Sequence, residues 1–130
     1  MKNLLLFVFI SSLIISCNKE PGEGGLATIT GKVNVEDYNQ NFTTLWAEYP
    51  GADLDVYIIY GNNVTFNDRV KTGPDGTYQF IALTKGDYKI YTYSKDSTLE
   101  SPSGQITIME NVTIAEKRQQ VIVPDMTIFE

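Results

Sequence analysis

Residues 73–90 read GPDGTYQFIALTKGDYKI, and this stretch decides the fold of the chain. Its first four residues predict a tight turn, because proline presets φ at the second position and the closing glycine tolerates a positive φ. The turn predicts a hairpin whose arms are residues 69–72 and 77–80. A second turn at residues 84–87 leads into a tyrosine-rich segment that begins at Tyr88.

Apolar and polar residues alternate on both sides of this stretch, from Leu26 onward. Such alternation, with a period of two residues, is typical of a β-strand. No run of ten residues keeps the i, i+3, i+4 spacing of an amphipathic helix. We therefore expect an all-β domain of about seven short strands packed as a sandwich. The clearest expected strands are residues 28–35, 55–60, 69–72, 77–80, 88–94, 105–108, 111–114 and 120–123.

Residues 75–90 resemble the D-G-x-[FY]-x-F-x-x-L-x-x-G-x-Y-x-[LIV] signature of transthyretin-like domains, which include carboxypeptidase regulatory-like and collagen-adhesin B-type repeats. Residues 30–33 and 51–58 are similar to the first two strands of that family. The resemblance covers most of residues 28–94 and implies a seven-stranded, Greek-key β-sandwich. It also implies one core that contains Ile29, Val33, Val56, Ile58, Tyr78, Phe80, Leu83, Tyr88 and Ile90.

The N-terminus carries a different signal. An apolar run over residues 4–15 ends at Ser16 and at Cys17, the only cysteine. Its length fits the h-region of a signal peptide and falls short of the roughly 20 residues that cross a bilayer. The segment looks like a bacterial lipoprotein signal, which implies cleavage before Cys17 and acylation of that residue with palmitate-type chains. An ordinary secretory signal is the alternative.

This interpretation divides the chain into a signal peptide (1–16), a flexible Gly/Pro-rich tether (17–25) and a sandwich domain (26–130). Two acyl chains hold a protein stably at a membrane. The step Lys19-Glu20 is similar to short signals that send lipoproteins to the cell exterior in one Gram-negative group, although Pro21 departs from them. We expect a lipid anchor in the outer membrane, with display at the cell surface as the further alternative.

Composition excludes several classes of function. The chain has 10 Lys and Arg against 16 Asp and Glu, which argues against a nucleic-acid partner because such partners need basic surfaces. Histidine is absent, and the single cysteine lies in the lipidation signal. Zinc sites of the Cys/His type, Ser-His-Asp triads and Cys-His pairs are therefore excluded. We expect a non-catalytic protein without a cofactor or a metal; a carboxylate-dependent enzyme is the remote alternative.

Two strands supply a candidate binding face. If Asp55 and the lysines of the tyrosine-rich strand face water, alternation turns a set of large side chains outward with them. These side chains are Tyr57, Ile59, Tyr91 and Tyr93. The transthyretin-like arrangement places the two strands side by side, so the four residues would form one patch suited to a sugar or a protein. The alternative is that they only reflect the preference of such residues for strands.

Three further features have both structural and functional interpretations. The long connection over residues 36–53 contains the only tryptophan, Trp46, which we expect to fold as a lid over the sandwich end. Acidic and amide residues flanking residues 55–60 offer oxygens to calcium, but their spacing matches no calcium loop. They are Asp53, Asp55, Asn62, Asn63 and Asp68. Lys32 occupies the position of a lysine that forms isopeptide bonds in some relatives, and we expect it to be solvated.

The function that fits these features is a membrane-anchored module that presents a binding face to an extracytoplasmic protein complex or glycan. A structural or assembly component of the envelope, similar to an adhesin or fimbria and acting through a sheet edge, is the alternative.

Overall fold

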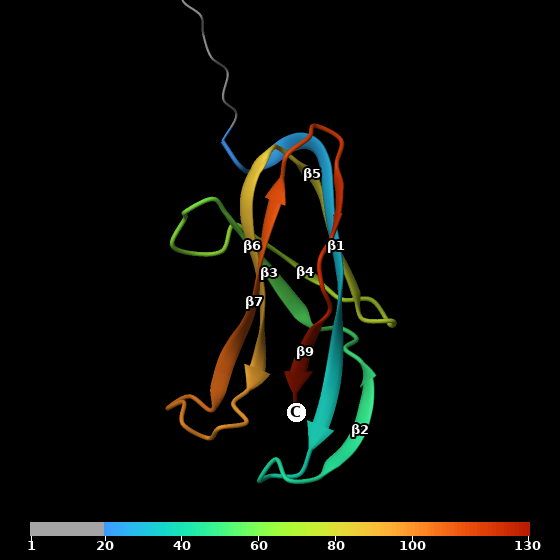
Figure 1. The fold of residues 1–130 in the computed structure, drawn as a ribbon, viewed down its shortest axis with the longest axis vertical. Coiled ribbons are helices and arrows are strands. Elements are labelled where there is room, and N and C mark those ends of the chain that lie inside the picture. Colours follow the sequence, from blue (N-terminus) through green and yellow to red (C-terminus); the bar gives the residue numbers. More distant parts are fainter. Residues whose placement is uncertain (1–19) are drawn as a thin grey trace, which may run out of the picture.

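The computed structural model describes residues 20–130, which form two β-sheets and contain no helix (Figure 1). The prediction of an all-β domain is confirmed. Its strands are β1 (Glu23–Tyr38), β2 (Leu45–Pro50), β3 (Asp55–Tyr60), β4 (Asp68–Lys71), β5 (Thr77–Leu83), β6 (Gly86–Lys95), β7 (Gln105–Ile114), β8 (Gln120–Ile122) and β9 (Met126–Phe129). The expected signal peptide (1–16), the lipidation residue Cys17 and the first part of the tether lie outside the described residues. From residue 20 onward there is no helix of the length and apolarity that crossing a bilayer requires.

The first sheet is organised around β1, a strand of 16 residues. The first half of β1 pairs with β5 on one side and with β8 on the other. Its second half pairs with β2 on one side and with β9 on the other. The second sheet has the order β4-β3-β6-β7, with every pair antiparallel. Figure 1 shows these two sheets as separate layers.

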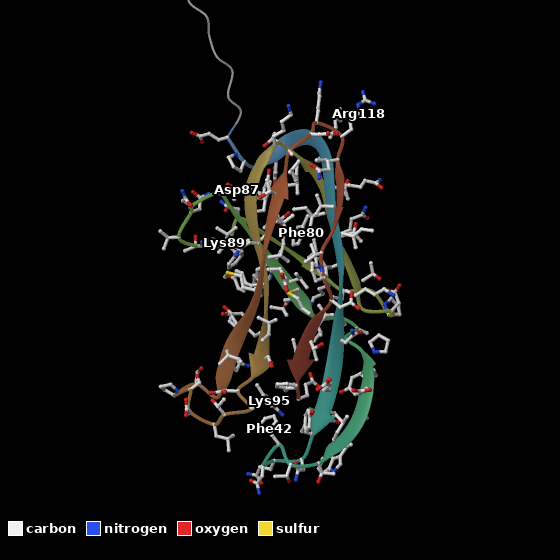
Figure 2. The ribbon with its side chains drawn as sticks, viewed as in Figure 1. Phe42, Phe80, Asp87, Lys89, Lys95 and Arg118 are labelled. Carbon is white, nitrogen blue, oxygen red and sulfur yellow. The ribbon has the colours of Figure 1, made fainter. Side chains whose placement is uncertain are left out.

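The two layers enclose one apolar core. Every core residue that the family resemblance implies is buried and belongs to a single cluster, which also includes Val112, Ile114, Val123 and Met126. Figure 2 shows Phe80 in the space between the sheets and Lys89 on the opposite side of β6. Burial of each large apolar side chain contributes roughly 1.5–3 kcal/mol, so this cluster is the main source of stability.

The turn at residues 73–76 forms as predicted, but the expected hairpin was wrong. Gly76 has φ of 81° and its amide donates to the Gly73 carbonyl at 3.0 Å. The arms on either side enter different sheets, because β4 pairs with β3 whereas β5 pairs with β1. Thr72 is buried and its amide donates to the Leu54 carbonyl at 2.9 Å, which holds the first arm in the β3 sheet. The turn therefore connects the two layers.

A tyrosine corner fixes the start of β6. The Tyr88 hydroxyl donates to the Thr84 carbonyl at 2.7 Å and accepts from the Gly22 amide at 2.8 Å. The Thr84 hydroxyl also donates to the Glu20 carbonyl at 2.8 Å. Residues 20–25 are therefore bonded to the domain and partly continue into β1, which corrects the prediction of a flexible tether up to residue 25.

The sequence did not predict β2 and β9, and it divided one strand, β7, into two. In β2 all six residues are exposed, so no apolar face marks the strand in the sequence. The short β9 follows β8 after only a few residues, and pairs with the far half of β1. The predicted strands 105–108 and 111–114 are parts of continuous β7. The eight expected segments thus correspond to seven of the nine strands in the described residues.

Candidate functional site

The predicted tyrosine patch gathers on the outer side of the β4-β3-β6-β7 sheet. Tyr57 lies opposite Tyr91 in the β3–β6 register, and their rings stack with centroids 5.0 Å apart and planes 13° apart. The Tyr93 ring packs edge-on against both, at 5.6 Å from Tyr57 and 5.8 Å from Tyr91. Ile59 follows on the same side of β3, opposite Lys89. All four predicted residues therefore share one face.

Exposure within this patch differs from the prediction that all four side chains lie at the surface. Ile59 and Tyr91 are only 9% and 8% exposed. The rings of Tyr57 and Tyr93 pack against Tyr91. Tyr57 is half-buried, and Tyr93 is 44% exposed. The patch is thus a packed aromatic layer whose accessible part is centred on Tyr93.

Two residues that the sequence did not single out complete the patch. Phe66, from the loop between β3 and β4, packs edge-on against Tyr57 with centroids 4.9 Å apart. Met109 of β7 lies opposite Tyr91 and is exposed. An isolated phenylalanine in a polar loop was the only signal for Phe66, and the true length of β7 was needed for Met109. We call Tyr57, Phe66, Tyr91, Tyr93 and Met109 the aromatic face.

The hydroxyls of the aromatic face make no hydrogen bonds that tie them to the rest of the described domain. Within residues 20–130, those of Tyr57, Tyr91 and Tyr93 bond to no backbone group or carboxylate, whereas Tyr49 and Tyr60 each donate to a glutamate. Burial, with a smaller effect of Tyr93, raises the pKa of the Tyr91 phenol above its ordinary value. That phenol therefore remains a hydrogen-bond donor throughout the physiological pH range.

Basic side chains flank the aromatic face. Arg69 of β4 lies opposite Tyr57, and Lys89 of β6 precedes Tyr91 by two residues on the same side. In the described part of the chain, the ion pairs are those of Lys71, which lies 3.4 Å from Asp55 and 4.0 Å from Asp53. Arg69 and Lys89 are left without a carboxylate partner there. Asp55 and Asp87 lie on the same side of these strands, and Asp55 is paired with Lys71. Arg69 and Lys89 are therefore the cations of this face that a partner could pair with.

Trp46 is not the lid that the sequence predicted. It lies on β2, which extends the β1 hairpin beyond the sandwich, and its side chain is 68% exposed. Together with residues of the β6–β7 connection it lines a groove. The β1–β2 hairpin and this connection lie at the end of the domain opposite to the start of the described chain (Figure 1).

The oxygen ligands considered for calcium do not come together. Asp53 and Asp55 precede and begin β3 and are paired with Lys71, while Asn62 and Asn63 follow the other end of the strand. Residues 20–130 contain no group of three or more acidic, cysteine or histidine side chains able to hold a metal. Lys32 is exposed on the outer side of β1, as expected for a solvated lysine.

No protein-family model matches this sequence, and neither does any curated protein. Among solved structures, the chain is similar to a candidate carbohydrate binding protein from Pseudomonas aeruginosa, with 17% identity and a TM-score of 0.49 over 79% of this chain and 90% of that one. It is also similar to an (S)-allantoin synthase, with 12% identity and a TM-score of 0.45 over 78% of this chain and 42% of the synthase. Likenesses this distant do not bear on function.

Proposed function

We propose that this protein is a lipid-anchored, non-catalytic binding module of the outer membrane whose aromatic face binds an extracytoplasmic protein. The stacked pair of Tyr57 and Tyr91, with Tyr93 exposed beside it, is the observation that carries the proposal. Tyrosine, phenylalanine, methionine and arginine are the residues enriched at protein interfaces. Tyrosine also offers a large contact area and a hydroxyl at a low cost in conformational entropy.

Charge selects the kind of partner. Arg69 and Lys89 flank the aromatic face and have no carboxylate partner within the described residues. A partner with acidic side chains opposite these two residues would gain complementary contacts, which raise specificity and the association rate. We therefore assign an acidic protein surface as the ligand of this face.

The proposed fold family is transthyretin-like. The pairing of β5, β1 and β8/β9 in one layer, and the order β4-β3-β6-β7 in the other, support this assignment. The signature at residues 75–90 maps onto the turn, β5 and the tyrosine corner. A solved structure with the same strand order and connections tests the assignment, and a different order would refute it.

The anchor is proposed from the sequence pattern that ends at Cys17. Cys17→Ser should release the protein from the membrane fraction and abolish incorporation of labelled palmitate. Protease treatment of intact cells then separates outward display from an inward orientation. A natural protein that stays in the membrane fraction without incorporating labelled palmitate would contradict the lipid anchor. That result would not bear on binding by the aromatic face.

The binding test uses a photo-crosslinking residue at position 93 of the full chain, with position 79 on the outer side of β5 as a matched control site. A partner captured only from position 93 is purified and titrated against the protein. Arg69→Glu and Lys89→Glu should each weaken its binding about tenfold, and added salt should weaken it further. Equal capture at both positions, or affinity indifferent to both charge reversals, would refute the proposed face.

A sheet edge supports the alternative function of an assembly component. β7 forms one edge of its sheet over 10 residues, which is long enough for an added strand. Glu110 lies on the core side of this edge strand, a placement that protects edges against pairing. We therefore rank assembly second. Oligomers that persist in the Tyr93→Ala and Arg69→Glu variants would favour it over the aromatic face.

A further inference from the structure

A groove of about 540 Å³ lies between the β1–β2 hairpin and the connection from β6 to β7. Sites for small ligands usually measure about 300–1,000 Å³ and combine apolar walls with a few polar groups. In Figure 1 the β1–β2 hairpin and the β6–β7 connection lie at the lower end of the sandwich, whereas the described chain begins near the upper end. It is separate from the aromatic face and uses none of its residues. We call it the distal groove.

Aromatic side chains form one wall of the distal groove. Tyr38 and Phe42 line it and pack together with Phe129 behind them, with ring centroids 5.4–6.3 Å apart. Trp46 lines the groove from β2 with 68% of its surface exposed. A large indole that is exposed beside a packed aromatic cluster gives an apolar platform for a flat ligand surface.

The backbone of the distal groove is strained where it presents apolar side chains. Phe42 and Leu99 have φ of 55° and 59°, and both line the groove. This left-handed region favours glycine and asparagine, because a β-carbon there lies too close to the following carbonyl oxygen. Leu99 is 65% exposed, so burial does not offset its strain. Strained residues cluster at functional sites, which gives a reason for large side chains at both positions.

Polar groups of both kinds surround this apolar wall. The carboxylates of Asp37, Asp96 and Glu130 and the ammonium of Lys95 line the groove, and no ion pair joins them. The Asp96 carboxylate is already engaged in hydrogen bonds within its own loop. Figure 2 labels Lys95 and Phe42 at the same end of the molecule. The hydroxyls of a sugar both donate and accept hydrogen bonds, so they match carboxylates and an ammonium together. A cationic ligand would meet Lys95, and an anionic ligand would meet the three carboxylates.

Both walls are held in place before a ligand arrives. The Asp96 carboxylate accepts four hydrogen bonds, from the Thr98 amide and hydroxyl and from the Glu100 and Ser101 amides, at 2.6–3.1 Å. The Asn39 side chain accepts from the amides of Thr43 and Thr44 at 2.8 and 2.9 Å, which orders the hairpin turn. Ordered walls lower the entropy that binding must overcome.

We propose that the distal groove binds an uncharged glycan, with one pyranose ring stacked on Trp46 and its hydroxyls bonded to Asp37, Glu130 and Lys95. This site goes beyond the proposed function, because it takes a different class of ligand on different residues. Its position far from residue 20 would direct the glycan site away from the anchored end of the chain.

The test uses the emission of Trp46, the only tryptophan in the chain and therefore a reporter within the site. The full chain, in a detergent without a sugar headgroup, is titrated with neutral hexasaccharides of glucose, mannose, galactose, xylose and N-acetylglucosamine. At least one of them should shift the emission and bind with a Kd below about 10 mM, as checked by calorimetry. Binding of none of the five at that concentration would overturn the proposal.

Variants separate a built site from general adhesion to the surface. Trp46→Ala and Leu99→Gly should each lower the affinity for the hexasaccharide about tenfold or more, as measured by calorimetry. Leu99→Gly is the sharper variant, because it relieves a strained φ and should leave thermal stability equal or higher. Tyr93→Ala, on the aromatic face, should leave sugar affinity unchanged. Unchanged affinity in Leu99→Gly and Trp46→Ala, or preferred binding of charged chitosan or polygalacturonate fragments, would refute the assignment.

Discussion

Tyr91 is buried beneath its neighbours while Tyr93, two residues later on the same side of β6, is 44% exposed. The two rings nevertheless touch, with centroids 5.8 Å apart and planes at 85°. The aromatic face therefore has a structural layer, in which Tyr91 stacks on Tyr57, and an accessible layer that Tyr93 represents. This division predicts that the two tyrosines have different effects on stability and binding.

Tyr91→Ala should lower the free energy of unfolding by about 2–4 kcal/mol, because it removes a buried ring and its stacking contact with Tyr57. Tyr93→Ala should lower it by less than about 1 kcal/mol, as expected for an exposed side chain. Urea unfolding of the two variants checks the difference. Equal losses would contradict the division of the aromatic face into a structural and an accessible layer.

Two buried tyrosine hydroxyls predict opposite effects of the same substitution. The Tyr88 hydroxyl bonds to Thr84 and Gly22, so Tyr88→Phe should cost about 1–2 kcal/mol and leave the Gly22 amide without its partner. The Tyr78 hydroxyl is buried with no hydrogen-bond partner among the described residues, and burial raises its pKa. Tyr78→Phe should therefore be neutral or stabilise by up to about 1 kcal/mol.

Denaturant unfolding of both phenylalanine variants measures the two effects side by side. Each variant loses one oxygen and keeps its ring, so the pair is matched in size. A loss of stability in Tyr78→Phe equal to that in Tyr88→Phe would show that the Tyr78 hydroxyl has a partner, such as an ordered water molecule.

Close packing of the Tyr78 ring on β1 explains why a glycine occupies position 31. A β-carbon added to Gly31 would lie 2.3 Å from the Tyr78 hydroxyl oxygen and 2.5 Å from the ring carbon that bears it. The ring is buried and cannot move aside easily, so Gly31→Ala should cost about 1–3 kcal/mol. In a Tyr78→Leu background the same change should cost less, and a double-mutant cycle by thermal or urea unfolding measures this coupling. Strict additivity would contradict the contact.

Local patterns in the sequence predicted most of the strands but not all of their partners. The turn at residues 73–76 is correctly located, yet a turn only reverses the chain and does not determine which sheet each arm joins. Alternation identified β3 and β6 because each has a buried face. β2 has no buried face and therefore carries no such pattern.

The candidate sites show the same limit. Alternation correctly placed Tyr57 and Tyr91 on one face, but their burial depends on Phe66 from a separate loop and on side chains of neighbouring strands. The distal groove combines the β1–β2 hairpin, the β6–β7 connection and the last described residue. Such segments meet only after the sandwich forms, so sequence spacing does not reveal the groove.

Asp96 predicts how acid acts on the wall of the distal groove. The hydrogen bond from the Thr98 hydroxyl, followed by those from the Ser101 and Thr98 amides, holds the pKa of the Asp96 carboxyl below its ordinary value. An unfolded aspartate titrates near pH 3.9, so the ionised form favours the folded state. This contribution is fully present above that pH and is lost as the pH falls through the lower folded pKa.

Asp96→Asn removes this titration and should destabilise the protein at neutral pH. The difference in unfolding free energy between the natural protein and the variant should stay constant from about pH 5 to 8 and shrink as the pH falls below about 4. The pKa of Asp75 is also lowered, but Asp75 is present in both proteins and cancels in the difference. Urea unfolding at a series of pH values measures it. A difference that is independent of pH down to 2.5 would show that the four hydrogen bonds to Asp96 do not require its charge.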